Sequence, residues 1–228
     1  MCTVVVRWDG SEENRILALR DELAGRAFDD PDSWWPEQPD VVGGRDRTAG
    51  GTWCASDVET GVTALVLNRP DKRFADPGAP SRGVLPLLAV RAGTDWPSEL
   101  DPAGMASFLL VHAAPDALTA WTFDGTTLRT DEHPPGTHMF TSGYAEDGKA
   151  ARHLPSFRSA DPDDWPSIPR RSPPADDPTA LLVRHTFDEG TFATVFGQLI
   201  TSRPGHLDLA YSRRPESDEP WTTLTRSG

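Results

Sequence analysis

The sequence predicts a single globular domain that is rich in β-strands and mostly antiparallel. Three observations predict this fold class. Short stretches are rich in β-branched and aromatic residues, turn signals separate neighbouring stretches, and a length of 228 residues commonly forms one unit. Tight turns join antiparallel strands. We therefore expect one domain over residues 1–228.

The first predicted element is a hairpin at the start of the chain. Residues 3–8 are rich in β-branched side chains, residues 9–11 read Asp-Gly-Ser, and residues 14–20 form the returning strand. If the turn centres near Ser11, the numbers of antiparallel partners sum to about 22. This register places Cys2 opposite Arg20 on the same face of the sheet.

Further elements follow along the chain. Residues 50–55 and 61–67 predict a second hairpin, which leaves Asn68 at the end of a strand. We expect Ser81 to cap a short helix that runs to about Arg91, and Asp101, which a proline follows, to start another. The remaining strands are expected at residues 108–113, 117–123, 126–129, 191–201, 207–212 and 221–225.

One segment is expected to lie outside the core. Residues 155–178 are rich in proline and acidic side chains. Such a composition favours turns over packed structure, so we expect a long surface loop there.

Composition argues against several classes of partner. The net charge of −13 and the pI near 4.8 disfavour nucleic acid and anionic membranes, because phosphate binding needs a basic surface. No stretch approaches the roughly 18 apolar residues of a membrane span, and the start lacks the apolar region of a signal peptide. Two cysteines build no disulfide framework and fit a reducing compartment. We therefore expect a cytoplasmic protein with a small-molecule substrate.

No metal or bound cofactor is expected. The six histidines show no zinc-protease spacing. Much of the acid lies in turn-rich segments, where solvated loops are a better interpretation than metal sites.

Cys2 is the main candidate for chemistry. Methionine aminopeptidase accepts small second residues, so we expect removal of Met1 to leave a thiol and an α-amine on one residue. An amine of pKa about 7.7–8.0 can act as the general base for a thiol of pKa about 8.5. Arg20 would lower the thiol pKa or hold a substrate oxygen. Asp21 would orient Arg20 and the amine, and Asn68 would donate to an oxyanion.

Each of these residues also has a structural interpretation. Cys2 could be a small apolar residue that starts a strand, and Arg20 with Asp21 could form only an ion pair. Asn68 could cap the end of its strand. Cys54 is expected to be a core residue.

An ordered series of motifs supports a functional role for Cys2. The chain opens with Met-Cys, and Leu-Arg-Asp-Glu at residues 19–22 is similar to an Asn-Arg-Asp-Glu motif. Four more segments follow in order: Trp-Trp at 34–35 with Gly-Arg-Asp at 44–46, Gly-Gly-Thr-Trp at 50–53, Asn68, and Ser-Arg-Gly at 81–83. Over roughly the first 90 residues the chain thereby resembles the NRDE-motif family, the Transport and Golgi organisation proteins.

The resemblance implies a fold and an activity. Members of this family look like N-terminal nucleophile hydrolases, with a four-layer αββα sandwich of mostly antiparallel sheets. The resemblance therefore implies an α+β fold and an amidohydrolase that acts on a small non-peptide C–N bond. Its catalytic residues would be Cys2, Arg20, Asp21 and Asn68, with the α-amine of Cys2 as the base.

Two segments depart from the family pattern. Residues 140–143 read Phe-Thr-Ser-Gly where the family tends to have Leu-Ser-Asn, and residues 190–194 lack an expected arginine. These losses favour an alternative class, a non-catalytic binding or carrier protein of the same fold. Because family members have been connected with heme handling, heme is the first ligand to test, with Cys2, His112 or His185 as candidate axial ligands.

Overall fold

The structure is a computed structural model that describes residues 2–143, 148–188 and 190–228. This part of the chain forms an α+β fold with two seven-stranded sheets and a few short helices. All the paired strands described in both sheets run antiparallel. The predicted α+β class with mostly antiparallel sheets is therefore confirmed.

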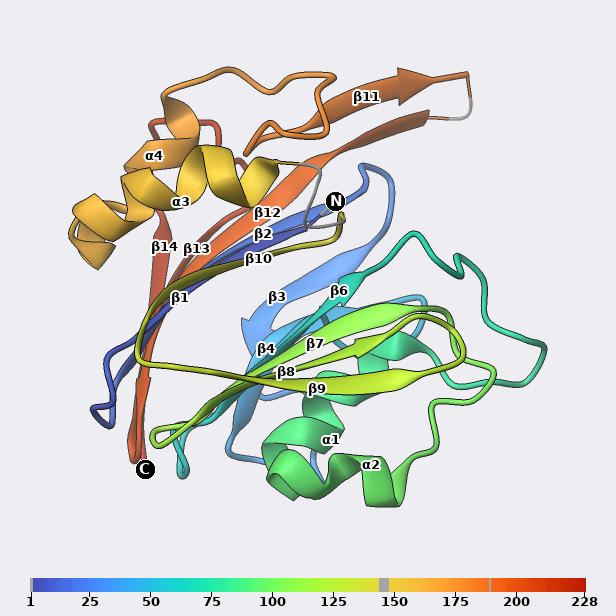
Figure 1. Ribbon diagram of the computed structural model, residues 1–228. Helices are drawn as coiled ribbons and strands as arrows, with labels where there is room; N and C mark the ends of the chain where they lie inside the picture. The colour runs from blue at the N-terminus through green and yellow to red at the C-terminus, as the bar shows by residue number, and fades with distance from the viewer. Residues whose placement is uncertain (1, 144–147, 189) are drawn as a thin grey trace.

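The first sheet combines strands from the two ends of the chain (Figure 1). Its order is β10-β1-β2-β12-β13-β14, and β11 pairs with β12. The strands are β1 (Thr3–Trp8), β2 (Asn14–Leu23), β10 (Gly136–Thr141), β11 (Arg184–Phe187), β12 (Gly190–Arg203), β13 (His206–Ser212) and β14 (Thr222–Ser227).

The second sheet is a meander in which each strand pairs with the next one along the chain. Its strands are β3 (Phe28–Asp32), β4 (Val41–Asp46), β5 (Cys54–Asp57), β6 (Thr63–Asn68), β7 (Phe108–Ala113), β8 (Leu118–Phe123) and β9 (Leu128–His133).

The two sheets stack on each other and helices cover their outer faces (Figure 1). Apolar side chains on both faces of the strands explain this packing. Along β1, Val4 and Val6 face the second sheet, whereas Val5 faces away from it. One apolar cluster therefore lies between the sheets. A second lies on the other face of the second sheet, under α1 (Leu85–Ala92) and α2 (Trp96–Glu99). A third packs α3 (Lys149–Ser159) and α4 (Ser167–Arg170) on the first sheet.

The N-terminal hairpin has the predicted register. Thr3 pairs with Leu19 and Val4 with Ala18, so the residue numbers sum to 22 as expected. The second hairpin is also confirmed, because Cys54 pairs with Leu65 in the strands that its two halves form. Strand β6 ends at Asn68.

The expected helix after Ser81 is confirmed with a short lead-in. The Ser81 hydroxyl accepts a hydrogen bond from the Gly83 nitrogen at 3.3 Å, which caps a single 3₁₀ turn before α1. By contrast, the prediction of a helix start at Asp101 is wrong. The Asp101 carboxylate instead accepts the Ala103 N–H at 2.9 Å in a turn, and the short helix α2 ends two residues before it.

The prediction of a surface loop over residues 155–178 is also wrong. Helix α3 continues through Pro155, and α4 follows within the same segment. Phe157 and Trp165 are fully buried, with their rings edge to face at 5.7 Å. A few apolar side chains facing the first sheet are enough to dock a segment whose other residues are polar.

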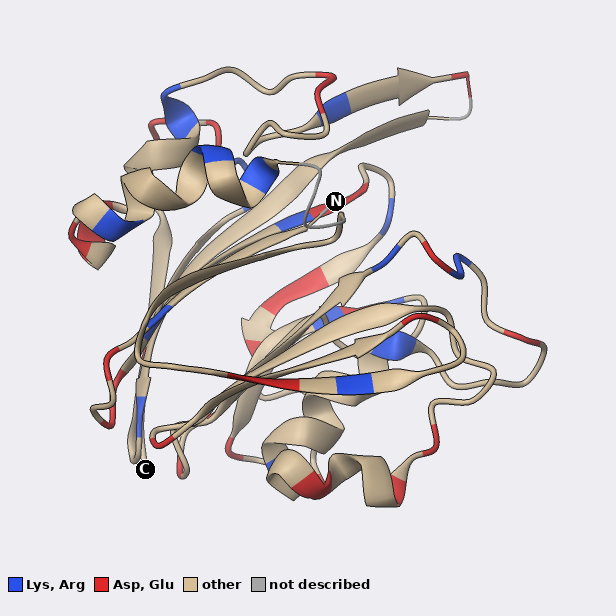
Figure 2. Cartoon of the chain, viewed as in Figure 1, with Lys and Arg blue, Asp and Glu red and all other residues tan. Residues whose placement is uncertain are grey.

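The acidic residues are not confined to one part of the fold. Acidic residues lie on turns and loops and also on the strands β3 and β9, as Figure 2 shows. No helix in the described ranges combines the length and apolar character needed to cross a membrane.

Candidate functional site

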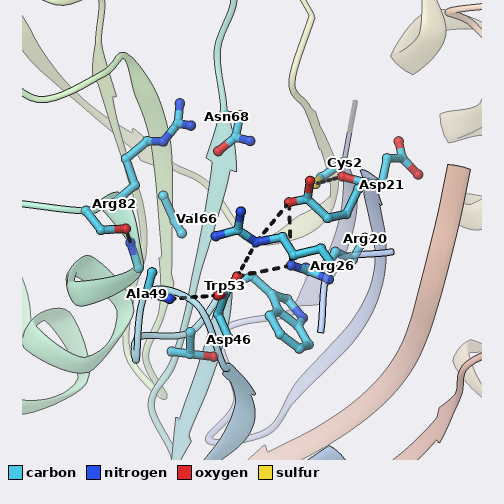
Figure 3. Close-up of a pocket in the computed structure, with 14 residues that line it drawn as sticks. Cys2, Arg20, Asp21, Arg26, Asp46, Ala49, Trp53, Val66, Asn68 and Arg82 are labelled. Atoms are coloured by element: carbon cyan, nitrogen blue, oxygen red, sulfur yellow. Dashed lines mark hydrogen bonds and ion pairs between the residues drawn. The ribbon is translucent and has the colours of Figure 1, made fainter. Parts of the chain in front are cut away.

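The four residues predicted to be catalytic line one cavity of about 230 Å³ (Figure 3). Cys2 precedes β1, Arg20 and Asp21 lie near the end of β2, and Asn68 ends β6 of the other sheet. Strand ends from both sheets thus meet here. The other lining residues are Glu22, Arg26, Asp46, Ala49, Thr52, Trp53, Val66, Ser81, Arg82 and Gly83.

The backbone of Cys2 is fixed by the strand that pairs with β1. The Cys2 nitrogen donates to Ser142 Oγ at 2.8 Å, and the Ser142 nitrogen donates to the Cys2 oxygen at 3.1 Å. The thiol lies 3.8 Å from the backbone oxygen of Asp21, to which it donates. Ser142 directly follows β10, so the antiparallel pairing of β1 with β10 brings the two residues together.

Arg20 lies between aromatic rings and carboxylates. Its guanidinium is 4.2 Å from the centre of the Trp53 ring and 5.1 Å from that of Phe28. Its Nη2 lies 3.5 Å from carboxylate oxygens of both Glu22 and Asp46. A planar guanidinium suits this combination of ring stacking and carboxylate contacts better than a lysine ammonium does. The side chain is only 6% exposed, and its Nη1 has no hydrogen-bond partner among the described residues.

Asp46 anchors the charged wall beside Arg20. Its Oδ2 accepts from Arg26 Nε at 2.6 Å, and its Oδ1 accepts the backbone N–H groups of Thr48 and Ala49 at 2.9 and 3.0 Å. Burial raises the pKa of this carboxyl, but these hydrogen bonds and the Arg26 charge outweigh it and hold the pKa below its usual value. Asp46 therefore stays ionised beside Arg20.

The carboxylate of Asp21 is hydrogen-bonded to the neighbouring strand, β12. Its Oδ1 accepts from Thr194 Oγ1 at 2.6 Å, and the Val183 nitrogen donates to the same hydroxyl at 2.9 Å. Burial raises the pKa of Asp21, and this is opposed by the positive charge of Lys149 and by the Thr194 hydrogen bond. Lys149 is itself 2% exposed, and burial lowers its pKa.

The thiol of Cys2 is not activated at rest. Burial raises its pKa, the negative charge of Asp21 raises it further, and the charge of Arg20 only partly opposes both. Arg20 does act to lower the thiol pKa, as expected. The net effect of all the surroundings is nevertheless a raised pKa. The thiol therefore needs a base before it can attack.

Two glycine-containing segments pack directly against each other at the cavity wall. The Thr52 nitrogen donates to the Gly83 oxygen at 2.9 Å. A Cβ at Gly51 would lie well inside contact distance of that same oxygen, so only glycine fits there. The Arg82 side chain, next to this contact, donates from Nη1 to the Ser107 oxygen at 2.9 Å.

The family model that matches this chain is described as Transport and Golgi organisation 2, and it covers residues 1–140. The chain belongs to this family. No curated protein matches it. The Transport and Golgi organisation 2 match covers more than half of the chain and contains all four predicted site residues. Ser142, Lys149 and Thr194 lie beyond it.

Sequence reasoning gave no role to several residues of the site. Asp46, Trp53 and Arg82 belong to segments already recognised as similar to Transport and Golgi organisation proteins, and that signal could have identified them. Ser142 and Thr194 lie in the two segments that depart from the family pattern. In each case a hydroxyl reaches the Cys2–Asp21 pair. Lys149 carries no signal in the sequence.

Proposed function

We propose that this protein is a cysteine N-terminal nucleophile amidohydrolase that acts on a small non-peptide C–N bond. The observation that carries the proposal is the meeting of Cys2, Arg20, Asp21 and Asn68 in one cavity. The proposal implies the four-layer αββα fold of such hydrolases. Two stacked sheets with helices on their outer faces support that assignment.

The proposed base is the α-amine that removal of Met1 would create on Cys2. The nitrogen 2.8 Å from Ser142 Oγ would become this amine, and Ser142 would orient it. Because the pKa of the thiol is raised, the thiol needs a general base, and the amine would take its proton as Sγ attacks. Asp21 would stabilise the resulting ammonium.

The remaining steps follow from the groups around the cavity. Attack of Sγ on the carbonyl carbon forms a C–S bond and an oxyanion, to which Asn68 and the unpartnered Nη1 of Arg20 donate. Collapse breaks the C–N bond, and the ammonium gives its proton to the leaving amine. Water then hydrolyses the thioester, which releases the acid and restores the thiol.

The size of the cavity favours a small substrate. Drug-sized ligands occupy pockets of roughly 300–1,000 Å³. A volume of about 230 Å³ is below that range. Two free thiols, Cys2 and Cys54, support the proposal that the reaction takes place in a reducing compartment such as the cytoplasm.

The heme-carrier alternative receives no support from the candidate axial ligands. His112 is 3% exposed and packs against Trp121 with ring centres 6.0 Å apart, so a heme could reach it only by displacing core residues. His185, which lies on β11, pairs with Asp176. Neither histidine lines the cavity of Cys2, which is also far too small to enclose a heme.

The proposal is tested by mass and turnover together. Intact mass should show loss of Met1, and limiting iodoacetamide should label Cys2 before Cys54, whose pKa burial raises to about 12. Wild type, Cys2→Ala and Cys54→Ala are then compared on a panel of small amides and esters. Turnover should vanish only in Cys2→Ala. Retention of Met1, or equal turnover by wild type and Cys2→Ala, would overturn the proposal.

A further inference from the structure

The cavity is lined by three arginines and three carboxylates, and two of each form ion pairs with one another. Arg20 and Arg26 share the carboxylates of Glu22 and Asp46, with nitrogen–oxygen distances between 2.6 and 3.8 Å. Two cations and two anions therefore balance each other within this wall. These four residues leave no net charge to attract a ligand.

Arg82 is the third guanidinium of the cavity, and it has a different environment. The hydrogen bond of its Nη1 goes to a neutral backbone oxygen, that of Ser107, at 2.9 Å. Within the described residues, no carboxylate lies within 4.0 Å of the Arg82 guanidinium nitrogens. The remaining acidic lining residue, Asp21, is engaged by Thr194 and attracted by Lys149. Among the described residues, Arg82 thus presents a positive charge that no carboxylate contacts directly.

Arg82 is also held in a fixed position. Besides the bond to Ser107, its neighbour Gly83 accepts the Thr52 N–H at 2.9 Å, and Ser81 caps the turn in which it lies. In Figure 3 the Arg82 side chain extends beside Asn68, on the side of the cavity opposite Cys2. A preorganised cation loses little side-chain freedom when it binds a ligand.

A second donor also lacks an acceptor in the cavity. Nη1 of Arg20 is buried without a hydrogen-bond partner among the described residues, and the guanidinium lies over the Trp53 ring. Buried donors are almost always satisfied in native proteins. An oxygen-rich ligand would satisfy this one.

We propose that the substrate carries a carboxylate in addition to its scissile amide, and that Arg82 binds this carboxylate while the amide carbonyl lies at Cys2 and Arg20. The inference rests on the proposed hydrolase and names its substrate class. In a protein of net charge −13, Arg82 would supply a positive charge at the point where the anion binds.

Two alkylating agents of similar size test this inference without any turnover. Iodoacetate and iodoacetamide both form a C–S bond with the thiol and release iodide, but only iodoacetate carries a carboxylate. The rate of Cys2 modification by each is measured at low salt by mass spectrometry, which separates it from Cys54. The iodoacetate-to-iodoacetamide rate ratio should exceed that of N-acetylcysteine by about tenfold or more. Acetate should protect Cys2, and iodoacetate should show saturation.

Substitutions assign the effect to Arg82. Arg82→Gln should return the rate ratio to that of N-acetylcysteine, whereas Arg82→Lys should keep most of the preference. Arg91→Gln is the matched control, because Arg91 lies on α1 outside the cavity, where it forms an exposed ion pair with Glu99 of α2. It should leave the ratio unchanged. Near-UV circular dichroism checks that each variant is folded.

Two outcomes would overturn the inference. One is a wild-type ratio equal to that of N-acetylcysteine without protection by acetate, which decides the matter even if Arg82→Gln does not fold. The other is a folded Arg82→Gln that keeps the preference. Failure of the hydrolase proposal would be seen separately, in the amide panel, because alkylation needs only a reachable thiol.

Discussion

Cys2 and Ser142 hold each other by two hydrogen bonds, although 140 positions separate them in the sequence. The Ser142 hydroxyl accepts from the Cys2 nitrogen, and the Ser142 nitrogen donates to the Cys2 oxygen. Ser142 is 4% exposed, so water does not replace it easily. The residue before β1 is thereby fixed at one end of the first sheet, where its thiol faces the cavity.

Ser142→Ala removes the acceptor of the Cys2 nitrogen and leaves the backbone bond in place. The unsatisfied N–H should reduce the free energy of unfolding by about 1–3 kcal/mol. Urea denaturation measures this change. Ser159→Ala is the control, since its exposed hydroxyl bonds to the nearby Ser156 oxygen, and it should change stability by less than about 0.5 kcal/mol. Equal stability of the two variants would contradict the prediction.

Gly51→Ala should force apart the two segments that form one wall of the cavity. The new Cβ would collide with the backbone oxygen of Gly83, and backbone cannot rotate away as a side chain can. Overpacking of this kind costs about 1–3 kcal/mol of unfolding free energy. Gly25→Ala is the matched control, because nothing lies within 4 Å of its Cβ position. If both variants unfold at the same urea concentration, the close approach is not a constraint.

Thr194→Val keeps the shape of the side chain but removes the hydroxyl that donates to Asp21. We expect the free energy of unfolding to fall by about 2 kcal/mol at neutral pH, since hydrogen bonds to charged groups are among the stronger ones. Without this bond the pKa of Asp21 should rise further above its ordinary value of 3.8.

The pH dependence of Thr194→Val follows from that shift. A carboxyl whose pKa is raised on folding binds more protons in the folded state, so its contribution to stability falls as the pH rises above 3.8. The deficit of Thr194→Val against wild type should therefore be larger at pH 7 than at pH 4. In an Asp21→Asn background the deficit should no longer vary with pH. A constant deficit in both backgrounds would argue against this coupling.

His112 should make stability increase with pH in the acid range. Burial lowers its pKa from 6.5 to about 4, so the unfolded chain binds more protons between these values. Its contribution to the unfolding free energy is therefore lost as the pH falls from 6.5 to 4, by about 3 kcal/mol. In His112→Phe the curve of unfolding free energy against pH should be flatter by that amount. Parallel curves for the two proteins would refute the assignment.

The sequence predicted the N-terminal hairpin and its register because both depend on local signals. A β-branched stretch, a turn and a second stretch fix the pairing of Thr3 with Leu19, and hence the approach of Cys2 to Arg20. Asn68 at the end of β6 follows from the same kind of pattern. These elements account for the four candidate residues that line the cavity.

The remaining parts of the site depend on pairing between distant segments. Thr194 reaches Asp21 only because β12 pairs with β2, and residues 136–141, which had no strand assignment, form the edge strand that brings in Ser142. Register between strands far apart in sequence is not set by any turn. The docking of residues 155–178 was missed for a similar reason. The few apolar residues of this segment pack against the first sheet, and the local sequence does not indicate that contact.

The two sheets differ in when a growing chain can complete them. The second sheet uses residues 28–133 in order, so it can form while synthesis continues. In the first sheet, β2 lies between β1 and β12, and its far edge is paired only after residue 190 has been made. Asp21 gains its hydroxyl partner at the same late stage. Translation therefore delays completion of the first sheet until the strands of the second sheet have been made.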